Sequence, residues 1–340
     1  MAPNGDKSVV IACDGFGEEL KATVVQHLKG KGVAVEDLGT DKFYLAAASV
    51  AKRVQQDPGS ATGMLFCGTG MGVSIIANKF SGVYAAVVEN EAAARNSRAI
   101  NNANVVCLGG KLTSVEEALR ISDAFLEQGF VTRPDTFMAK FWSPEVEGFL
   151  QASSAEIQEV EEQAHREQPC TEAQAPSVVV ACDGFGEELK DVVVQHLKDK
   201  GVNVQDLGND KFYQAAASVA RLVQRDPSNA TGMLFCGTGM GVSIVANKFK
   251  GVYAAVAENE AAARNSRHYN ANVVCLGGKL TSEAEALRIA DAFLEQRFVA
   301  QPDTFMGKFW SPEVEGFLKT STAEIQEVEE ETFGKTQVVQ

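Results

Sequence analysis

The sequence is written twice, and this duplication constrains the fold more than any other feature of the chain. The segment VVIACDGFGEELK at residues 9–21 returns as VVVACDGFGEELK at residues 178–190, an offset of 169. The offset holds through Arg267 and then falls to 168, since Asn272 pairs with Asn104, so the second copy lacks one residue. A period this long is typical of a duplicated domain and not of a solenoid repeat.

Each repeat alternates short apolar runs with amphipathic segments, a pattern that predicts strands alternating with helices. In the first repeat we expect strands at 9–13, 33–37, 63–67, 82–88 and 103–108, and helices at 17–29, 46–56, 73–79, 89–98 and 116–128. Strands that are apolar throughout and alternate with helices indicate a parallel sheet covered on both faces. The predicted fold class is therefore α/β, with two Rossmann-like, three-layer α/β/α domains that each contain a five-stranded parallel sheet.

A helical C-terminal extension is predicted after each core, at residues 137–162 and again from Phe305. Between the repeats, residues 163–176 are polar and aperiodic, which indicates a linker. We therefore expect one domain at residues 1–162 and a second at residues 177–332, each made of a core and its extension.

The composition excludes several classes of protein. A net charge of -14 argues against binding to nucleic acid and to anionic membrane surfaces. No apolar stretch approaches the roughly 18 residues of a membrane span, and the start, MAPNGDKSVV, does not resemble a signal peptide. Seven cysteines without a CxxC pair indicate free thiols in a reducing compartment, so we expect a cytoplasmic location and leave an organelle open.

The motif that points most directly to chemistry is LFCGTGMGVS, at residues 65–74 and again at 234–243. A cysteine at the end of an apolar strand is followed at once by three alternating glycines and then by a helix. Such glycines let backbone N–H groups gather round an anion, and the positive helix end can lower the pKa of the thiol. The motif lacks the P-loop lysine and the spacing of a dinucleotide fingerprint. A nucleotide nevertheless stays open as one alternative ligand of the loop.

Four segments resemble the ribose-5-phosphate isomerase B family, which includes the galactose-6-phosphate isomerase subunits: ACDGFGEELK, EDLGT, GMLFCGTGMGVSIIANK and NANVVCLGG. The resemblance covers most of residues 8–135 and 177–303, and the CGTGxGxS…ANK block is its most specific part. The extension and the spelling ACDGFG are most similar to plant isomerase-B-like proteins of DNA-damage tolerance. The resemblance implies interconversion of aldose and ketose phosphates through an enediolate, with no metal and no cofactor.

The resemblance also assigns roles to residues of both repeats. Cys67 and Cys236 would be the catalytic bases, and the glycine loops would stabilise the enediolate. The residues implied in opening the sugar ring or binding its hydroxyl groups are Asp14, Asp183, Thr69, Thr238 and, near the position of the family's ring-opening histidine, His268. The substrate-binding residues implied are Gly68, Gly70, Gly72, Ser74, Asn101 and Arg133 in repeat 1, and Gly237, Gly239, Gly241, Ser243 and Asn270, the counterpart of Asn101, in repeat 2.

Departures from the family pattern bear on catalysis. Gly15 and Gly184 replace the histidine that follows the first-strand aspartate in the family, and Ile100 stands at the place of the ring-opening histidine. Arg133 alone matches the family's phosphate-binding arginines, and its counterpart is Gln301. The alternative to an isomerase is therefore a catalytically impaired, isomerase-like protein that acts as a sugar-phosphate sensor or as a structural or assembly subunit.

The partners implied are a phosphorylated sugar and the other half of the chain. The family forms dimers whose active sites take residues from both subunits, so two fused copies imply one intramolecular pseudo-dimer. The Cys67 site would then receive His268, whereas the Cys236 site would receive Ile100 and Asn101. We therefore expect isomerase activity to reside mainly at Cys67. Further self-association or an assembly partner stays open.

Overall fold

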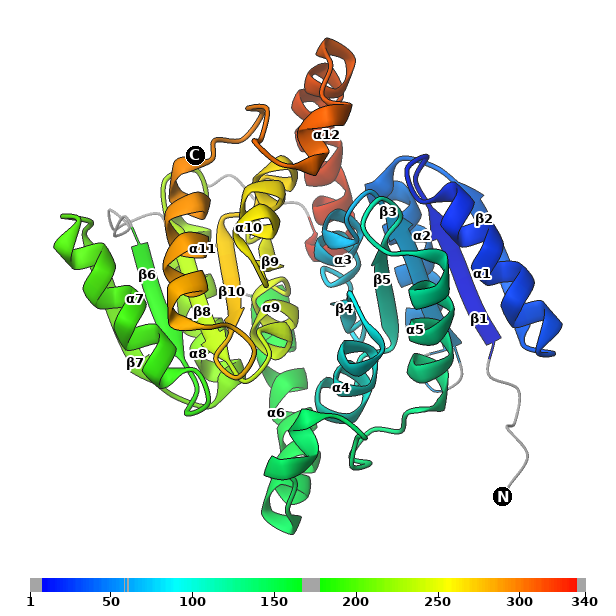
Figure 1. The fold of residues 1–340 in the computed structure, drawn as a ribbon, viewed down its shortest axis with the longest axis horizontal. Helices are drawn as coiled ribbons and strands as arrows, with labels where there is room; N and C mark the ends of the chain where they lie inside the picture. The colour runs from blue at the N-terminus through cyan, green and yellow to red at the C-terminus, as the bar shows by residue number, and fades with distance from the viewer. Residues whose placement is uncertain (1–7, 58, 60, 167–177, 335–340) are drawn as a thin grey trace. The chain divides into compact units, whose positions relative to one another are not determined.

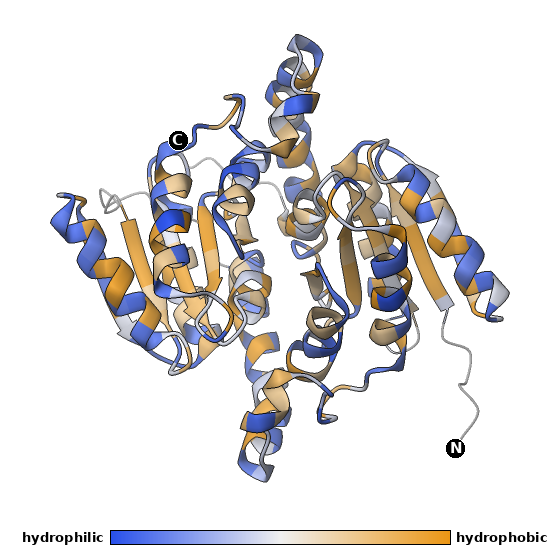
Figure 2. Cartoon of the chain, in the orientation of Figure 1, coloured by the Kyte–Doolittle hydropathy of each residue, from blue (hydrophilic) through white to orange (hydrophobic). Residues whose placement is uncertain are grey.

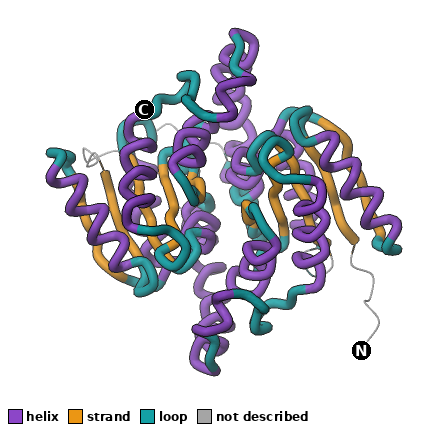
Figure 3. The backbone as a smooth tube through the Cα atoms, in the orientation of Figure 1, coloured by secondary structure: helices purple, strands orange, loops and turns teal. Residues whose placement is uncertain are grey.

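The chain forms two compact units that divide between Gln158 and Glu159 in a computed structural model. The structure describes residues 8–57, 59, 61–166 and 178–334. Within each unit, strands lie between two layers of helices (Figure 3). This arrangement confirms the predicted α/β class with two five-stranded sheets.

Unit 1 follows the predicted alternation of strands and helices. Its elements are β1 Ser8–Cys13, α1 Glu18–Gly30, β2 Ala34–Thr40, α2 Phe43–Gln56, β3 Ala61–Cys67, α3 Met71–Ala77, β4 Ala85–Val87, α4 Glu91–Asn101, β5 Val105–Gly109 and α5 Val115–Glu127, followed by the 3₁₀ helix η1 Phe137–Phe141 and the long helix α6 Pro144–Arg166. The strands are parallel in the order β2-β1-β3-β5-β4.

Unit 2 repeats this plan. Its elements are β6 Val178–Cys182, α7 Glu187–Asp199, β7 Val204–Asn209, α8 Phe212–Arg225, β8 Thr231–Cys236, α9 Met240–Ala246, β9 Ala254–Val256, α10 Glu260–Ser266, the 3₁₀ helix η2 Arg267–Tyr269, β10 Val273–Gly277, α11 Glu283–Glu295, the 3₁₀ helix η3 Phe305–Phe309 and α12 Pro312–Phe333. The strand order β7-β6-β8-β10-β9 is that of unit 1.

The sheet of each unit is a buried layer, because helices cover both of its faces. In unit 1, α1, α5 and α4 pack side by side on one face, and α2 packs with α3 on the other (Figure 1). The central strand β3 is buried along its whole length, and the strands stand out as apolar elements in Figure 2. The edge strand β2 is mostly exposed. The central strands therefore end inside the unit, where their carboxyl ends can carry buried functional groups.

The extension and the linker differ from the prediction. Residues 163–166, expected to open the linker, form the last turn of α6, and the unit boundary lies inside this helix. Their apolar and polar positions continue the helical spacing, with Val160 and Ala164 both buried. The rest of the predicted linker, which includes Cys170, lies outside the described residues.

Candidate functional site

The strand order brings the thiol and the first aspartate together. Strand β1 pairs with β3 in parallel, with Cys13 opposite Phe66, so Asp14 follows β1 where Cys67 ends β3. The N–H of Asp14 donates to the carbonyl of Phe66 at 2.9 Å, which holds this register to the end of the strands. In unit 2 the N–H of Asp183 donates to Phe235 in the same way at 3.0 Å. Each unit thus places a carboxyl beside its motif cysteine.

Both motif thiols are buried and receive hydrogen bonds from their own loops. Gly70 N–H donates to Cys67 Sγ at 3.1 Å, and Gly239 N–H donates to Cys236 Sγ at 3.2 Å. Burial raises the pKa of Cys67 to about 11, with the charge of Asp14 adding to the effect, although N–H groups of Val73, Thr69 and Gly70 oppose it. The pKa of Cys236 is raised to about 12 for the same reasons.

The glycine loop is held by close backbone packing. Gly70 has a φ of 81° and Gly239 a φ of 78°, both in the left-handed region that glycine adopts without strain. A Cβ on Gly70 would lie 3.1 Å from the carbonyl oxygen of Cys107 on β5. Gly110 N–H in turn donates to Cys67 O at 2.7 Å. The loop therefore has one conformation, and glycine is required at its turn.

The hydroxyl groups of the loop form hydrogen bonds with the first residue of the helix that follows. Thr69 is buried, and its Oγ1 accepts a hydrogen bond from Met71 N–H at 3.3 Å. The Ser74 hydroxyl donates to Met71 O at 2.9 Å, so its proton is engaged within α3. Gly68 lies in the turn and Gly72 in the first turn of α3. Unit 2 repeats these positions with Thr238, Ser243, Gly237 and Gly241.

The aspartate beside each thiol titrates far above an ordinary aspartate. Asp14 Oδ1 accepts hydrogen bonds from Phe16 N–H at 2.9 Å and Gly17 N–H at 3.1 Å. Burial nevertheless raises the pKa of Asp14 to about 6, against the lowering effect of these N–H groups and of Lys111. Asp183 has the same two kinds of donor and a pKa of about 6. This carboxyl can therefore gain or lose a proton near neutral pH.

Lys111 is a functional candidate that the motif analysis missed. It follows β5, its N–H donates to Gly68 O at 3.1 Å, and its ammonium group lies 6.0 Å from the centre of the Phe16 ring. Lys279 stands in the same relation to Gly237 and Phe185 in unit 2. The signal in the sequence is a lysine after VVCLGG in both repeats, at the carboxyl end of the strand next to β3. It places a positive charge beside the thiol loop.

The ends of helices α4 and α10 correct the expected pairing of asparagines. Asn102 and Asn270 both follow their helices in the left-handed conformation, with φ of 49° and 55°. Asn270 is therefore the counterpart of Asn102, not of Asn101. The missing residue shortens the helix and tightens its last turn to 3₁₀ geometry in η2. Asn101 stays in α4, and its buried amide Nδ2 has no hydrogen-bond partner.

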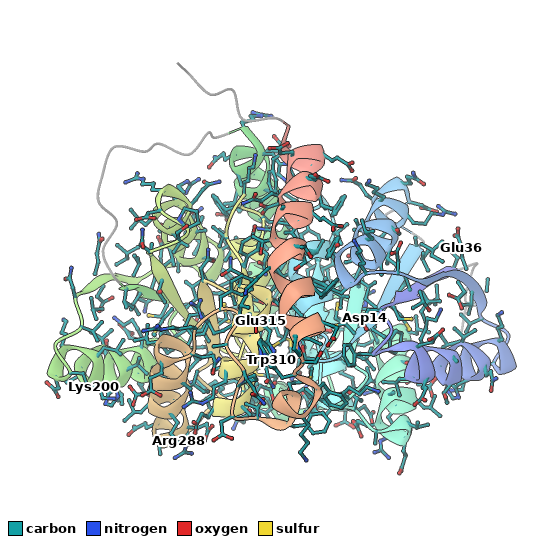
Figure 4. The ribbon with its side chains drawn as sticks, turned by 90° about the horizontal axis from the view of Figure 1, so that it is seen from above. Asp14, Glu36, Lys200, Arg288, Trp310 and Glu315 are labelled. Carbon is teal, nitrogen blue, oxygen red and sulfur yellow. The ribbon has the colours of Figure 1, made fainter. Side chains whose placement is uncertain are left out.

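His268 is buried in unit 2 against an aromatic ring. It is 7% exposed, and its ring centre lies 5.1 Å from that of Trp310, which precedes α12 (Figure 4). Burial lowers the pKa of His268 to about 4, so the imidazole is neutral near pH 7. Its Nε2 is buried without a hydrogen-bond partner.

Arg133 is the candidate that the structure does not join to its own thiol site. It is exposed in the segment between α5 and η1, and it makes no ion pair with a described residue. Its counterpart Gln301 donates through Nε2 to Gly307 O at 3.0 Å.

No three His, Cys, Asp or Glu side chains in the described part of the chain gather in a way that could hold a metal ion. None of the described helices is long and apolar enough to cross a membrane.

Comparisons with known proteins agree with the resemblance noted in the sequence. The Ribose/Galactose Isomerase family model matches residues 9–137 and 178–304. The DNA damage-repair/toleration protein DRT102 of Arabidopsis thaliana is 38% identical over 153 residues, which are 45% of this chain and about half (49%) of that protein. The probable ribose-5-phosphate isomerase B of Mycoplasma genitalium is 40% identical over 129 residues, 36% of this chain and 85% of that protein.

A solved structure completes the comparison. It is the crystal structure of ribose-5-phosphate isomerase B from Mycoplasma genitalium with bound ribulose-5-phosphate. It is 33% identical, has a TM-score of 0.41, and covers 46% of this chain and 97% of that chain.

Proposed function

Because the chain belongs to the Ribose/Galactose Isomerase family, we propose that it interconverts an aldose and a ketose that carry a phosphate group. The observation that carries the proposal is the thiol of Cys67, bonded to a loop of N–H donors with the titrating carboxyl of Asp14 beside it. Relatives named ribose-5-phosphate isomerase B and D-erythrulose-4-phosphate isomerase support a phosphorylated sugar as the substrate class.

In the proposed reaction, sulfur acts as a base on carbon. A thiolate at Cys67 removes the proton from the carbon next to the carbonyl, and the electron pair moves into the enediolate. The proton then returns to the former carbonyl carbon, and the hydroxyl proton passes from one oxygen of the enediolate to the other, so the sugar is neither oxidised nor reduced overall. N–H groups of the glycine loop would stabilise the enediolate oxygen, as such donors do for oxyanions in other enzymes.

The raised pKa of the resting thiol gives Asp14 a second role in this proposal. At pH 7 the thiol of Cys67 is protonated, and the negative charge of Asp14 is one reason. When Asp14 takes up a proton, for example from the anomeric hydroxyl of a closed sugar while a solvent proton passes to the ring oxygen as its bond to the anomeric carbon breaks, that repulsion disappears and the pKa of Cys67 falls. Ring opening at Asp14 would thus favour the thiolate that the next step needs.

The test is turnover of ribose 5-phosphate by the full chain and by Cys67→Ser, Cys236→Ser and the double variant. We expect the double variant to lose about 10²–10⁴-fold in kcat, the usual contribution of a general base. We also propose that Cys67→Ser lowers kcat more than Cys236→Ser does, because the family's active sites take residues from both subunits. Equal losses would contradict this asymmetry, and full activity in the double variant would overturn the thiol mechanism.

The second candidate function is sugar-phosphate binding without turnover. It is favoured by the pKa of about 11 at Cys67, which keeps the resting thiol protonated, and by the burial of His268 against Trp310. A thermal-shift measurement with ribose 5-phosphate beside the turnover assay separates the two. Stabilisation without turnover supports a sensor, whereas neither response supports a structural subunit, and stabilisation by a nucleotide alone supports the nucleotide alternative.

A further inference from the structure

Each unit contains a half-buried arginine whose hydrogen bonds go to backbone carbonyls. Arg98 on α4 donates to Ala103 O through one guanidinium nitrogen and to Gln128 O through Nε, at 3.4 Å for the latter. Its guanidinium also lies 5.4 Å from the centre of the Phe125 ring. Arg98 makes no ion pair with a residue that the structure describes, and burial lowers its pKa.

Arg267 repeats this arrangement in unit 2. It donates to Ala271 O and, through Nε, to Gln296 O at 3.0 Å, and its guanidinium lies 5.1 Å from the Phe293 ring. The bonds are kept although α10 and η2 together are one residue shorter than α4. A fork of N–H donors can bridge two carbonyls in this way, whereas a single ammonium group cannot match both directions.

The two carbonyls belong to the two segments that carry outlying candidates for substrate binding in unit 1. Ala103 lies just beyond the turn at Asn101, and Gln128 begins the segment that leads to Arg133. Arg98 therefore ties these two segments to each other through one side chain.

The segment after Gln128 is strained and is held from several sides. Val131 has a φ of 50°, a left-handed conformation that a β-branched residue rarely adopts. Its N–H donates to Ala99 O at 3.1 Å, and Gln128 Nε2 donates to Thr132 O at 2.8 Å. Val299 has a φ of 56° at the same place in unit 2. Such strain persists only where the surroundings determine the backbone, and it is concentrated at functional sites.

We propose that Arg98 and Arg267 are positioning residues, each a latch that sets the end of its helix and the turn that follows (99–104 or 268–272) against the strained segment 128–133 or 296–301. The proposal deepens the proposed function and rests on it in one respect, because it assigns Asn101 and Arg133 to the binding of a phosphorylated sugar. The latch itself is a property of the fold and can be measured without turnover.

The test compares Arg98→Lys with Arg95→Lys on the same helix. Lysine keeps the charge at position 98 but cannot bridge both carbonyls. Arg95 is the matched control, because it pairs with Glu91 at 2.8 Å and Glu127 at 3.4 Å and forms no hydrogen bond with either segment. Arg267→Lys and Arg264→Lys form the equivalent pair in unit 2.

Hydrogen exchange of the full chain without ligand tests the latch. We expect amides of residues 99–104 and 128–133 to exchange about tenfold faster in Arg98→Lys than in Arg95→Lys, as local opening becomes easier. Unchanged exchange in both segments would overturn the latch, whether or not the protein is an isomerase.

Calorimetric titration with ribose 5-phosphate, together with kcat, tests positioning. We expect at least one of Arg98→Lys and Arg267→Lys to raise the Kd about tenfold, the effect of one displaced charged hydrogen bond, with Tm within a few degrees of the parent. Faster exchange with unchanged Kd and kcat in both variants would show that the arginines stabilise the fold without positioning the binding residues, and it would overturn the proposal. Absence of turnover in the parent would refute the isomerase proposal alone, because exchange and Kd still decide this one.

Discussion

The thiol loops of the two repeats make the same hydrogen bonds, whereas the helices that follow β4 and β9 end differently. Sγ of Cys67 and of Cys236 each accept from a glycine N–H, at 3.1 and 3.2 Å. By contrast, α4 runs to Asn101, and α10 stops at Ser266 and continues as the 3₁₀ helix η2. A loop packed on the backbone of a neighbouring strand cannot lose a residue, but a helix end can absorb the loss by tightening its last turn.

The tail helices α6 and α12 carry a second pair of equivalent residues, and both members are buried. Both contain the sequence EIQEVEE, in which Glu161 of α6 corresponds to Glu329 of α12. Glu161 forms a buried ion pair with Lys248 at 2.8 Å, whereas Glu329 accepts hydrogen bonds from Gly251 N–H and the Tyr253 hydroxyl at 2.9 and 3.0 Å. Both tail helices therefore place a buried, partnered glutamate at the same position of their shared sequence.

The largest effect is expected from Glu161→Gln. It leaves the ammonium of Lys248 buried without its carboxylate, and breaking a buried pair in this way costs about 3–5 kcal/mol of unfolding free energy. Chemical denaturation measures the loss, and Glu162→Gln, at an exposed position of the same helix, is the control. Glu329→Gln should also destabilise the chain, because Glu329 is buried and accepts two hydrogen bonds. An unfolding free energy unchanged in Glu161→Gln would show that the buried pair with Lys248 does not stabilise the fold.

The next largest effect is a pH dependence of the unfolding free energy. It is expected only from the shortened helix end of unit 2, which carries His268. The pKa of His268 is about 4 in the folded chain and near 6.5 when unfolded, so the unfolded state binds the extra proton between these values. Stability contributed by the neutral ring is complete above pH 6.5 and is lost as the pH falls to 4, by about 3 kcal/mol in total.

His268→Phe, which keeps a ring against Trp310, should remove this part of the pH dependence. The measurement is unfolding free energy between pH 4 and 7, with His196→Phe at a half-exposed site as the control. An unchanged pH slope in His268→Phe would show that the imidazole is not buried as the structure has it.

Alanine in the thiol loop tests whether the two loops are equally constrained. Gly70→Ala adds left-handed strain and a Cβ 3.1 Å from Cys107 O, for about 2–3 kcal/mol together, and Gly239→Ala should cost the same. Gly82 has a φ of 71° and open space around it, so Gly82→Ala should lose stability through the left-handed conformation alone. Thermal denaturation compares the three, and equal losses at positions 70 and 82 would mean that the loop does not pack as tightly as described.

Removing the charge beside each thiol should stabilise the chain. The pKa of Asp14 is raised to about 6, so the folded state holds a proton that the unfolded state releases near pH 4, and stability falls as the pH rises from about 4 to 6. Asp14→Asn keeps an acceptor for the N–H groups of Phe16 and Gly17. It should therefore gain about 1–2 kcal/mol above pH 6 and nothing below pH 4.

The same variant reports on the thiol. The pKa of Cys67 should fall, as thiolate absorbance in a pH titration would show, while isomerase turnover falls as well. Asp183→Asn should repeat both changes at Cys236. Lower stability at pH 7 in either variant would argue against the raised pKa of the carboxyl.

The smallest effect is expected at the glycines that replace the family's histidine. A Cβ on Gly15 meets nothing within 4 Å, and the φ of Gly15 lies outside the left-handed region. Gly15→Ala should therefore stabilise the fold by about 0.4–1 kcal/mol, because alanine lowers the conformational entropy of the unfolded chain. Gly184→Ala should match it. The more informative variant is Gly15→His, which the open space admits, with ribose 5-phosphate turnover as the readout. A loss of stability in Gly15→Ala would indicate a strained backbone at this turn.

Local patterns predicted most of the fold and placed the thiol–glycine loops at the ends of β3 and β8. Apolar runs such as residues 63–67 and the helical spacing of 17–29 located their elements to within a few residues, because burial of one strand or one helix face leaves its period in the sequence. The linker start was wrong, because a polar helix turn that continues α6 has no apolar period of its own. The pairing of Asn101 with Asn270 was wrong, because a deletion inside a helix can be placed only by backbone conformation.

The sequence by itself determined the duplication, the α/β class and a thiol–glycine loop at a strand end, since each depends on neighbours in the chain. The tertiary structure decided the chemical state of that loop, because burial and the carboxyl of Asp14 outweigh the N–H groups expected to lower the pKa of Cys67. It also revealed Lys111 and the Arg98 latch, whose partners lie on other strands and helices. Electrostatics and hydrogen bonding depend on distance in space, and separation along the chain does not record it.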